Sequence, residues 1–295
     1  MLSILIPIYN FEVTKLVQVL HQQGLQLPVS FEIILVDDAS TKLQTKRANE
    51  LLQKLEFVTL HELANNIGRA KIRNYLAQLA QYDFLAYMDG DSMPVDSCFL
   101  ACYYEHLNPE VVLCGGRTYQ VKQPNNQAQL LHWKYGSVRE VTTAAQRIEV
   151  PYRSFMTNNF VVPKSIIVQF PFDESITQYG HEDTLFGVAL EQSNIPIRHL
   201  DNPLEHIDIE TASVFLSKTE RAIQNLWCLH LQYDLAGKVK LLNYYLWCKK
   251  WRIAGLVYFV YQLLAPLIQR NLKSSNPNLY LFDVYKLALL IKIAR

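Results

Sequence analysis

The chain has 295 residues, of which 50% are hydrophobic, so it is long and apolar enough for one large domain or two ordinary domains with packed cores. Only 19% of the residues are charged and the net charge is +1, which excludes wholesale disorder and argues against nucleic acid as a partner, because nucleic-acid-binding domains carry a strong basic excess. The five cysteines, an odd number without a CxxC pair, are interpreted as reduced thiols of a cytoplasmic protein.

The first residues, MLSILIPIYN, are apolar but lack a basic leader, and Pro7 interrupts them, so we expect a first strand instead of a signal peptide. From there to about Gly116, short β-rich runs alternate with amphipathic stretches. The predicted strands are LSILIPI, FEIILVDD, FVTLHE, DFLAYMD and EVVLCGG, and the predicted helices are Val13–Gln23, Leu43–Lys54, Gly68–Gln81 and Cys98–Leu107. Apolar strands that alternate with helices indicate an α/β fold whose mostly parallel sheet is covered by helices on both faces.

The chain is less regular after this point. Residues 117–153 show weak periodicity, with one predicted helix at Gln127–Tyr135. TNNFVVP predicts a strand, GHEDTLFGVALEQ a helix opened by Gly180, and IPIRHLDNP a closing strand and loop. The sequence becomes helical after Thr211. We therefore expect one domain over residues 1–210, with halves 1–116 and 117–210, and a helical extension over residues 211–295.

Two carboxylates separated by one glycine follow an apolar strand in FLAYMDGD. Asp89 and Asp91 are therefore expected at the edge of the sheet and close together. Such a pair suits a hard cation such as Mg²⁺ or Mn²⁺, which takes one or two carboxylates and completes its shell with phosphates and water. The alternative is a solvated turn, in which the same pattern is common.

Two further stretches carry polar residues near strand ends. IILVDDAS brings Asp37 and Asp38 to the end of the second strand, where they either accept hydrogen bonds from a base or a sugar, or cap a helix in a solvated turn. In NNIGRAKIRNYLA, a predicted helix carries Arg69, Lys71 and Arg73, which cannot all face the same way. At least one should reach the sheet edge and meet an anion, unless the three form an ordinary charged face.

YGHEDTLFG places Glu182 and Asp183 in the first turn of a helix that then becomes apolar. The helix dipole stabilises acidic residues there, which is the simple explanation, but a carboxylate at a helix start beside a pocket is also well placed as a general base. His206, in DNPLEHID, follows a loop marked by proline. A lone histidine is usually structural, yet near a metal it becomes a candidate ligand.

In this order, SILIPIYN, ILVDDAS, NIGRAKIRN, YMDGD and GHEDTLFG resemble the motifs of the family 2 glycosyltransferases, over about residues 2 to 206. The resemblance implies a GT-A domain, with a mostly parallel sheet flanked by helices, followed by a helical C-terminal extension. It also implies a nucleotide-diphosphosugar donor, UDP-sugar first, with Mn²⁺ or Mg²⁺ and inversion at the anomeric carbon. The acceptor is expected to be a saccharide or a lipid-linked saccharide in the synthesis of a bacterial cell-surface polysaccharide or lipopolysaccharide.

The resemblance also implies residue roles. Asp91, Asp89 and His206 would ligate the metal, and Asp183, in preference to Glu182, would be the catalytic base. The residues expected to bind the nucleotide sugar are Pro7, Tyr9, Asp37, Asp38, Arg73 and Asp89. The family often has an aromatic residue and two glycines before the acidic pair, and the Tyr-Gly-His at 179–181 leaves the acceptor-facing wall undefined.

Two other interpretations stay open. A nucleotidyltransferase shares the sheet pattern and the metal-binding carboxylates, but it normally has a glycine-rich phosphate loop where this chain has YNFEVT. A non-catalytic GT-A scaffold would bind a nucleotide sugar without turnover. A dinucleotide-dependent oxidoreductase needs GxGxxG after a strand, and the sequence contains none.

The stretch from Leu241 onward combines apolar, aromatic and basic residues. Its longest nearly uncharged run, Ile253 to Ile268, is shorter than the roughly twenty residues that span a membrane. Trp247 and Trp251 lie among basic residues, a combination typical of interfacial association. We expect either a peripheral contact with the inner face of the cell membrane or a helix packed on the catalytic domain.

Overall fold

The computed structural model describes residues 1–176 and 178–295, and packing divides them into two compact units. The first unit contains Met1–Thr118, the described residues of 141–177, and Glu182–Asp208. The second contains Tyr119–Glu140, Gln178–His181 and Ile209–Arg295. Residues 119–140 thus pack with the C-terminal helices. The domain division at residues 116 and 210 stays a prediction.

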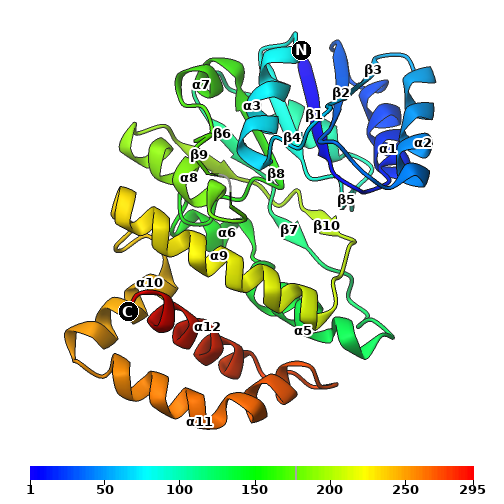
Figure 1. Ribbon diagram of the computed structural model, residues 1–295. Coiled ribbons are helices and arrows are strands. Elements are labelled where there is room, and N and C mark those ends of the chain that lie inside the picture. Colours follow the sequence, from blue (N-terminus) through cyan, green and yellow to red (C-terminus); the bar gives the residue numbers. More distant parts are fainter. Residues whose placement is uncertain (177) are drawn as a thin grey trace. The chain divides into compact units, whose positions relative to one another are not determined.

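The first unit is built on a seven-stranded sheet in the order β3-β2-β1-β4-β8-β6-β9 (Figure 1). β1, β2, β3 and β4 are parallel neighbours, β8 runs antiparallel to both β4 and β6, and β9 is parallel to β6. The expected mostly parallel α/β sheet is therefore confirmed. The strands are β1 (Leu2–Ile8), β2 (Phe31–Asp37), β3 (Val58–Glu62), β4 (Phe84–Met88), β6 (Val112–Cys114), β8 (Asn159–Pro163) and β9 (Ile197–His199).

Helices cover both faces of this sheet because its strands are apolar on both sides. On β1, Ile4 and Ile6 belong to one buried cluster and Leu5 to the other, as the alternation of side chains along a strand requires. The first cluster includes residues of α1 (Thr14–Gly24) and α4 (Phe99–Tyr104). The second includes residues of α3 (Arg69–Leu79), α7 (Lys164–Gln169) and α8 (Glu182–Gln192). The unit also has α2 (Leu43–Glu50), a 3₁₀ turn (Leu51–Lys54) and α6 (Ala144–Ile148).

A second, three-stranded sheet was not expected from the sequence. It has the order β5-β10-β7, formed by β5 (Ser92–Pro94), β10 (Leu204–His206) and β7 (Arg117–Thr118). His206 pairs with Ser92 in the antiparallel ladder, and Glu205 pairs with Thr118 in the parallel one. These strands have only two or three residues each, too few for a periodic pattern to be visible in the sequence. The small sheet nevertheless brings three distant segments together beside the Asp89–Asp91 turn.

The regular structure of the second unit is helical. Its elements are a 3₁₀ turn (Gln127–Gln129), α5 (Leu130–Tyr135), a π-turn (Gly136–Glu140), α9 (Ala212–Tyr233), α10 (Lys240–Lys250), α11 (Ala254–Leu272) and α12 (Leu279–Ile293). The predicted helix at 127–135 and the helical region after Thr211 are confirmed. Among the described residues no single helix is both long and apolar enough to cross a membrane. Helices α10 and α11, which are bent by 113° relative to each other, reach that length and composition only as a pair.

One helix start differs from the prediction. The helix expected to open at Gly180 begins two residues later, at Glu182. Gly180 and His181 both have positive φ, at 94° and 71°, which is incompatible with a right-handed helix. The two acidic residues are therefore the first two of α8, where the helix dipole favours negative charge.

Candidate functional site

The predicted site residues lie at the carboxyl ends of three neighbouring parallel strands. β1 pairs with β2 on one side and with β4 on the other. β1 leads into Tyr9, which is 55% exposed. β2 ends at Asp37, which Asp38 follows, and β4 leads into the Asp89–Asp91 turn. Pro7 lies opposite Val36 within the ladder itself. This edge of an open α/β sheet is where ligands collect, because several loops converge there.

The turn between the two carboxylates requires glycine. A Cβ on Gly90 would lie 2.9 Å from Val13 Cγ1 and 3.5 Å from the carbonyl oxygen of Pro7. The backbone on either side is fixed as well, because Asp89 N donates to Asn158 O at 3.1 Å and Ile207 N donates to Asp91 O at 2.9 Å. The turn is thus held against β1, β8 and the small sheet.

Arg73 links the turn to α8. Its side chain is 2% exposed, and its Nη2 donates to Asp89 Oδ1 at 2.9 Å. Its Nη1 lies 3.7 Å from Glu182 Oε1, which Arg69 Nη1 also contacts at 3.3 Å. Arg117 Nη2 lies 3.8 Å from the other oxygen of Asp89. Two carboxylates and three guanidinium groups therefore form one partly buried network, in which each buried charge has a partner.

Asp91 stands apart from this network and faces His206. Asp91 Oδ1 and His206 Nδ1 are 3.5 Å apart, and the imidazole is 8% exposed. Burial alone would raise the pKa of Asp91, but His206, Arg117 and Arg69 outweigh it and hold the pKa well below its usual range. Asp91 is therefore a carboxylate at neutral pH. An oxygen and a nitrogen donor side by side fit a divalent cation of the first transition row.

No group of three or more His, Cys, Asp or Glu side chains suited to a metal ion occurs among residues 1–176 and 178–295. A cation at Asp91 and His206 would take the rest of its shell from water and a phosphorylated ligand, as Mg²⁺ and Mn²⁺ commonly do. Asp89, predicted as a further ligand, is held by Arg73 and Arg117 in this structure.

The two acidic residues at the start of α8 have opposite electrostatic environments. Burial would raise the pKa of Glu182, but Arg69 and Arg73 outweigh it, so that pKa is lowered. Burial and the adjacent charge of Glu182 raise the pKa of Asp183 to about 6. Asp183 Oδ1 accepts a hydrogen bond from Thr184 N at 2.7 Å. The negative charge of Glu182 is thus balanced by the arginines, whereas Asp183 has the proton affinity of a general base near neutral pH.

Asp37 and Asp38 bind backbone amides. Asp37 Oδ1 accepts from Ser40 N at 2.6 Å, while Asp38 accepts from Ile67 N at 2.6 Å and from Gly68 N at 3.1 Å. Burial raises the pKa of Asp38, although these two amides oppose the shift. Asp38 therefore holds the loop that leads into α3, the helix that carries Arg73. A direct role of either carboxylate in binding a nucleotide stays a prediction.

Three residues at this site were missed from the sequence. Arg117 contacts Asp89, and it follows the predicted strand EVVLCGG, which was the available signal. Asn158 is 3% exposed, and its Nδ2 and Oδ1 have no hydrogen-bond partner within the described part of the chain; the same holds for Ser92 Oγ. Buried polar atoms without partners are costly, so such atoms beside Asp89 and Asp91 indicate a ligand site.

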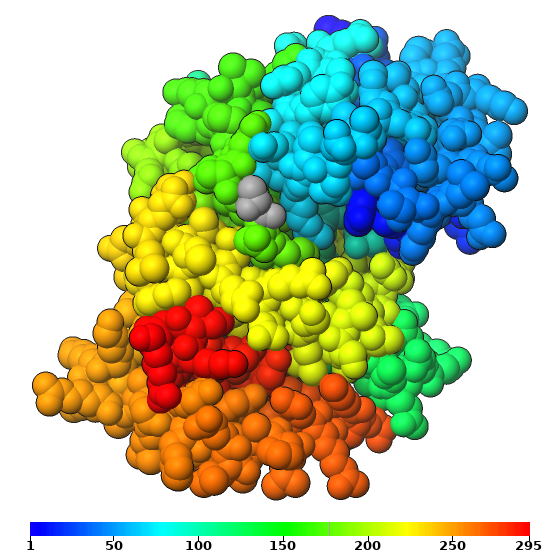
Figure 2. Space-filling view, in the orientation of Figure 1, coloured from blue at the N-terminus to red at the C-terminus, as the bar shows by residue number. Residues whose placement is uncertain are grey.

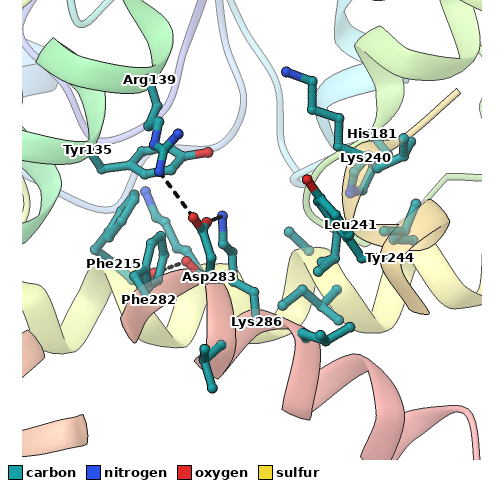
Figure 3. A pocket seen from close by; sticks show the side chains of 18 of the residues that line it. Tyr135, Arg139, His181, Phe215, Lys240, Leu241, Tyr244, Phe282, Asp283 and Lys286 are labelled. Carbon is teal, nitrogen blue, oxygen red and sulfur yellow. Dashed lines mark hydrogen bonds and ion pairs between the residues drawn. The ribbon is translucent and has the colours of Figure 1, made fainter. Parts of the chain in front are cut away.

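A separate pocket of about 850 Å³ lies within the second unit (Figure 3). Asp283 accepts contacts from Arg139 at 3.1 Å and Lys286 at 3.0 Å, while Lys218 and Lys240 add positive charge. Its aromatic lining residues are Tyr135, Tyr179, Phe215, Tyr244, Tyr280 and Phe282. Apolar and aromatic walls with a few charged groups are typical of a small-molecule site.

Comparison with known proteins adds a family profile and several relatives. The profile described as Glycosyl transferase family 2 matches residues 3–167. An uncharacterized glycosyltransferase of Haemophilus influenzae is 24% identical, over 83% of this chain and 94% of its own length. Validoxylamine A glucosyltransferase of Streptomyces hygroscopicus subsp. limoneus is 25% identical, over 67% of this chain and 49% of its own length. Chondroitin synthase of Escherichia coli is 23% identical, over 70% of this chain and 34% of its own length.

Solved structures establish the fold. The mannosyltransferase PcManGT of Pyrobaculum calidifontis, solved with GDP-Man and Mn²⁺, has a TM-score of 0.52 at 15% identity and covers 76% of this chain and 62% of its own. Residues 1–349 of TarS from S. aureus, solved with UDP-GlcNAc, have a TM-score of 0.51 at 18% identity. The match covers 99% of this chain and 90% of the TarS chain. The predicted GT-A architecture is confirmed.

Proposed function

Since this chain belongs to glycosyl transferase family 2 and has the GT-A fold, we propose that it is an inverting, cation-dependent glycosyltransferase. It transfers a sugar from a nucleotide-sugar donor to an acceptor hydroxyl. UDP-sugar is the proposed donor, since TarS is among the similar structures and has been solved with UDP and UDP-GlcNAc. The similar mannosyltransferase, solved with GDP-Man, keeps GDP-sugars as the competing choice.

One observation carries the proposal. Arg73 contacts Asp89, in the turn that precedes Asp91, and Glu182, the residue before Asp183. A buried guanidinium therefore ties the turn that would receive the diphosphate to the helix that supplies the base. Sequence alone placed these groups more than ninety residues apart, and a non-catalytic scaffold has no need of this link.

Asp91 and His206 are the residues proposed to hold the cation. When bound there, the cation neutralises negative charge that develops on the departing nucleotide diphosphate. The imidazole nitrogen favours Mn²⁺ over Mg²⁺, because Mg²⁺ prefers oxygen ligands. Arg73 and Arg117 hold Asp89 beside this position, so the turn is already fixed before a donor binds.

Asp183 is proposed as the base of a single displacement. Its carboxylate takes the proton of the acceptor hydroxyl as that oxygen forms a bond to the anomeric carbon, and the bond from this carbon to the diphosphate breaks. The anomeric configuration inverts because attack comes from the face opposite the leaving group. With a pKa of about 6, Asp183 is deprotonated at pH 7 and still basic enough to accept the proton.

We assign acceptor recognition to the pocket of the second unit. Tyr179 and His181 line that pocket and immediately precede Glu182 and Asp183 in the chain. Its aromatic rings suit the apolar faces of sugar rings, and its lysines suit an acidic or phosphorylated saccharide. Such an acceptor fits the proposed role in the synthesis of a cell-surface polysaccharide or lipopolysaccharide on the cytoplasmic side of the membrane.

The test is a thermal-shift screen of UDP-, GDP- and dTDP-sugars with and without Mn²⁺. A ligand present at about 100 times its Kd stabilises the fold by about 2.7 kcal/mol, so one nucleotide should stand out. Asp91→Asn should remove the part of the shift that depends on Mn²⁺. Asp83→Asn is the matched control, because Asp83 is exposed and precedes β4, at the opposite end of the strand from Asp89.

Turnover separates the enzyme from the scaffold. With the nucleotide sugar that stands out, the wild-type chain should release nucleoside diphosphate, slowly to water and faster once an acceptor is supplied. A wild-type chain that binds the sugar and releases nothing with any acidic or neutral saccharide acceptor would leave only the non-catalytic interpretation. Formation of a new nucleotide sugar from a nucleoside triphosphate would identify a nucleotidyltransferase instead.

A further inference from the structure

Helix α11 exposes a continuous apolar stripe. Leu256, Phe259, Val260, Leu263 and Leu267 are between 44% and 66% exposed, and they follow one another at spacings of three, one, three and four residues. In a helix with 3.6 residues per turn these positions share one face. Figure 2 shows residues of this helix, coloured orange, at the molecular surface. Single exposed apolar residues are ordinary, but a contiguous stripe marks an interaction surface.

The opposite face of α11 accounts for the packing of the helix. Tyr261, Ile268 and Leu272 are buried, and α11 packs against α12 within the second unit (Figure 1). The helix therefore has its core contact without the stripe. Exposing an apolar helix face to water is unfavourable. A face of this kind that takes no part in core packing therefore indicates contact with a partner.

The sequence segment that contains the stripe carries charge of one sign. Between Leu235 and Phe282 the sequence contains seven Lys and Arg residues and no Asp or Glu, although the whole chain has a net charge of +1. Outside this segment the chain is therefore net negative. Lys249, Lys250 and Arg252 are exposed at the bend between α10 and α11, and Arg270 is exposed near the other end of α11.

Exposed aromatic residues adjoin the stripe. Trp247 and Trp251 are 55% and 63% exposed at the end of α10, directly before α11. Tryptophan prefers the boundary between hydrocarbon and lipid headgroups, because its ring is apolar and its N–H is polar. Apolar face, cationic flanks and boundary tryptophans together are the pattern of a helix that lies in the plane of a membrane surface.

We propose that α11 and the end of α10 dock this protein on an anionic lipid bilayer. The stripe enters the headgroup boundary, and the cations at the two ends of α11 meet lipid phosphates. A second copy of the chain is the weaker occupant, because pairing two such segments would bring their like charges together. This inference is independent of the proposed reaction, since it uses no residue of the strand-end site.

The test is co-sedimentation of the full chain with phosphatidylcholine vesicles that contain or lack phosphatidylglycerol. The chain should partition onto the anionic vesicles at low salt and much less onto neutral ones, and the binding should weaken as salt screens the charges. Lys249→Glu with Lys250→Glu should weaken partitioning by more than about tenfold, since each cation near an anionic surface contributes roughly a fivefold factor.

Stripe variants separate insertion from charge attraction. Leu263→Gln with Phe259→Gln should weaken partitioning about tenfold or more, while Leu43→Gln, at a leucine 60% exposed in the first unit, should leave it unchanged. Lys54→Glu with Lys122→Glu is the charge control, because both lysines are exposed and lie outside the segment. Circular dichroism and melting temperature verify that each variant is folded.

Tryptophan fluorescence supplies a second readout. Binding should shift the emission of Trp247 and Trp251 to shorter wavelength, and bromine-labelled lipid tails should quench it. Trp247→Phe with Trp251→Phe should lose this signal. The proposal is overturned if the chain does not bind anionic vesicles at low salt, or if the stripe variants bind as well as wild type. It is also overturned if the stripe variants abolish a concentration-dependent dimer that forms without lipid.

Discussion

Charged side chains are arranged in opposite ways in the two units. At the strand ends of the first unit, Arg73 is nearly fully buried and is shared between Asp89 and Glu182. In the segment from α10 to α11, basic residues are exposed beside exposed leucines, with no acidic residue in that stretch of sequence. The first arrangement is internally compensated. The second has no acidic residue within its segment and is proposed to meet a lipid surface, so mutations should affect reaction and stability in one unit and association in the other.

The largest effect is expected at the proposed base. Asp183→Asn should lower kcat by about 10² to 10⁴ with little change in donor binding, because a well-placed general base contributes a factor of that size. In the wild type, kcat should fall about tenfold per pH unit below pH 6, as Asp183 becomes protonated. Nucleoside diphosphate release against pH checks both statements. A near-normal kcat in this variant would transfer the role to another group.

Loss of the shared arginine should cost the most stability. Arg73→Ala leaves Asp89 and Glu182 without their buried partner, and breaking a buried ion pair in this way costs about 3 to 5 kcal/mol. Urea unfolding measures the free energy of unfolding. Arg221→Ala, at an exposed arginine of α9, is the control and should change it by less than about 0.5 kcal/mol. Equal effects of the two variants would contradict the buried network.

Asp183, the proposed base, should lower the free energy of unfolding at pH values at which its carboxyl group is charged. Folding raises the pKa of Asp183 from 3.8 to about 6, so the folded chain binds a proton that the unfolded chain has already released. Stability therefore falls as pH rises from about 4 to about 6, and the loss is complete above that range. Asp183→Asn should stabilise the fold by about 1 to 3 kcal/mol at pH 7.5 and by little at pH 4. Thermal unfolding at both pH values checks the sign.

Two glycine substitutions should change the free energy of unfolding in opposite directions. Gly90→Ala places a Cβ 2.9 Å from Val13 Cγ1, so it should destabilise the fold by about 1 kcal/mol or more and weaken the Mn²⁺-dependent donor shift. Gly255 lies on α11, where the nearest atom is the end of Arg295 at 4.0 Å. Gly255→Ala should therefore stabilise by about 0.5 to 1 kcal/mol through helix propensity. Chemical unfolding of both variants gives the comparison directly.

The smallest stability effect is expected on the stripe. Leu263→Ala, at a residue 66% exposed, should change the free energy of unfolding by less than about 0.5 kcal/mol. Leu272→Ala, on the same helix but fully buried, should cost about 2 to 5 kcal/mol. A large loss of stability at Leu263, measured by urea unfolding, would mean that the stripe belongs to the core and not to a docking surface.

Much of the fold was predictable because its signals are local. The strands β1, β2, β3, β4, β6, β8 and β9 were recognised from apolar runs, and the helices α1 to α5 from their periodicity. The short helices α6 and α7 were not predicted. The small sheet was missed because its strands are too short to show any pattern, and they pair only when three distant segments meet. The start of α8 was misplaced because two consecutive positive φ angles are set by the surrounding structure and not by residue type alone.

The candidate site was predictable in its residue types but not in its pairings. The carboxylates at the strand ends were identified because aspartates after apolar strands are conspicuous. Nothing local indicated that Arg73 contacts both Asp89 and Glu182, or that Arg117 contacts Asp89. The resemblance preferred Asp183 to Glu182 as the base, but the difference between their pKa values was hidden, because a pKa depends on burial and on charges brought close by folding.

The sequence by itself determined the α/β class, the strand-end carboxylates and the cationic, apolar character of the C-terminal segment, because periodicity and composition are properties of neighbouring residues. Only the tertiary structure decided which carboxylate is neutralised by arginine, which is left basic, and which side of α11 is free of packing. Those outcomes depend on distance and desolvation between residues far apart in the chain, and both arise only when the chain is folded.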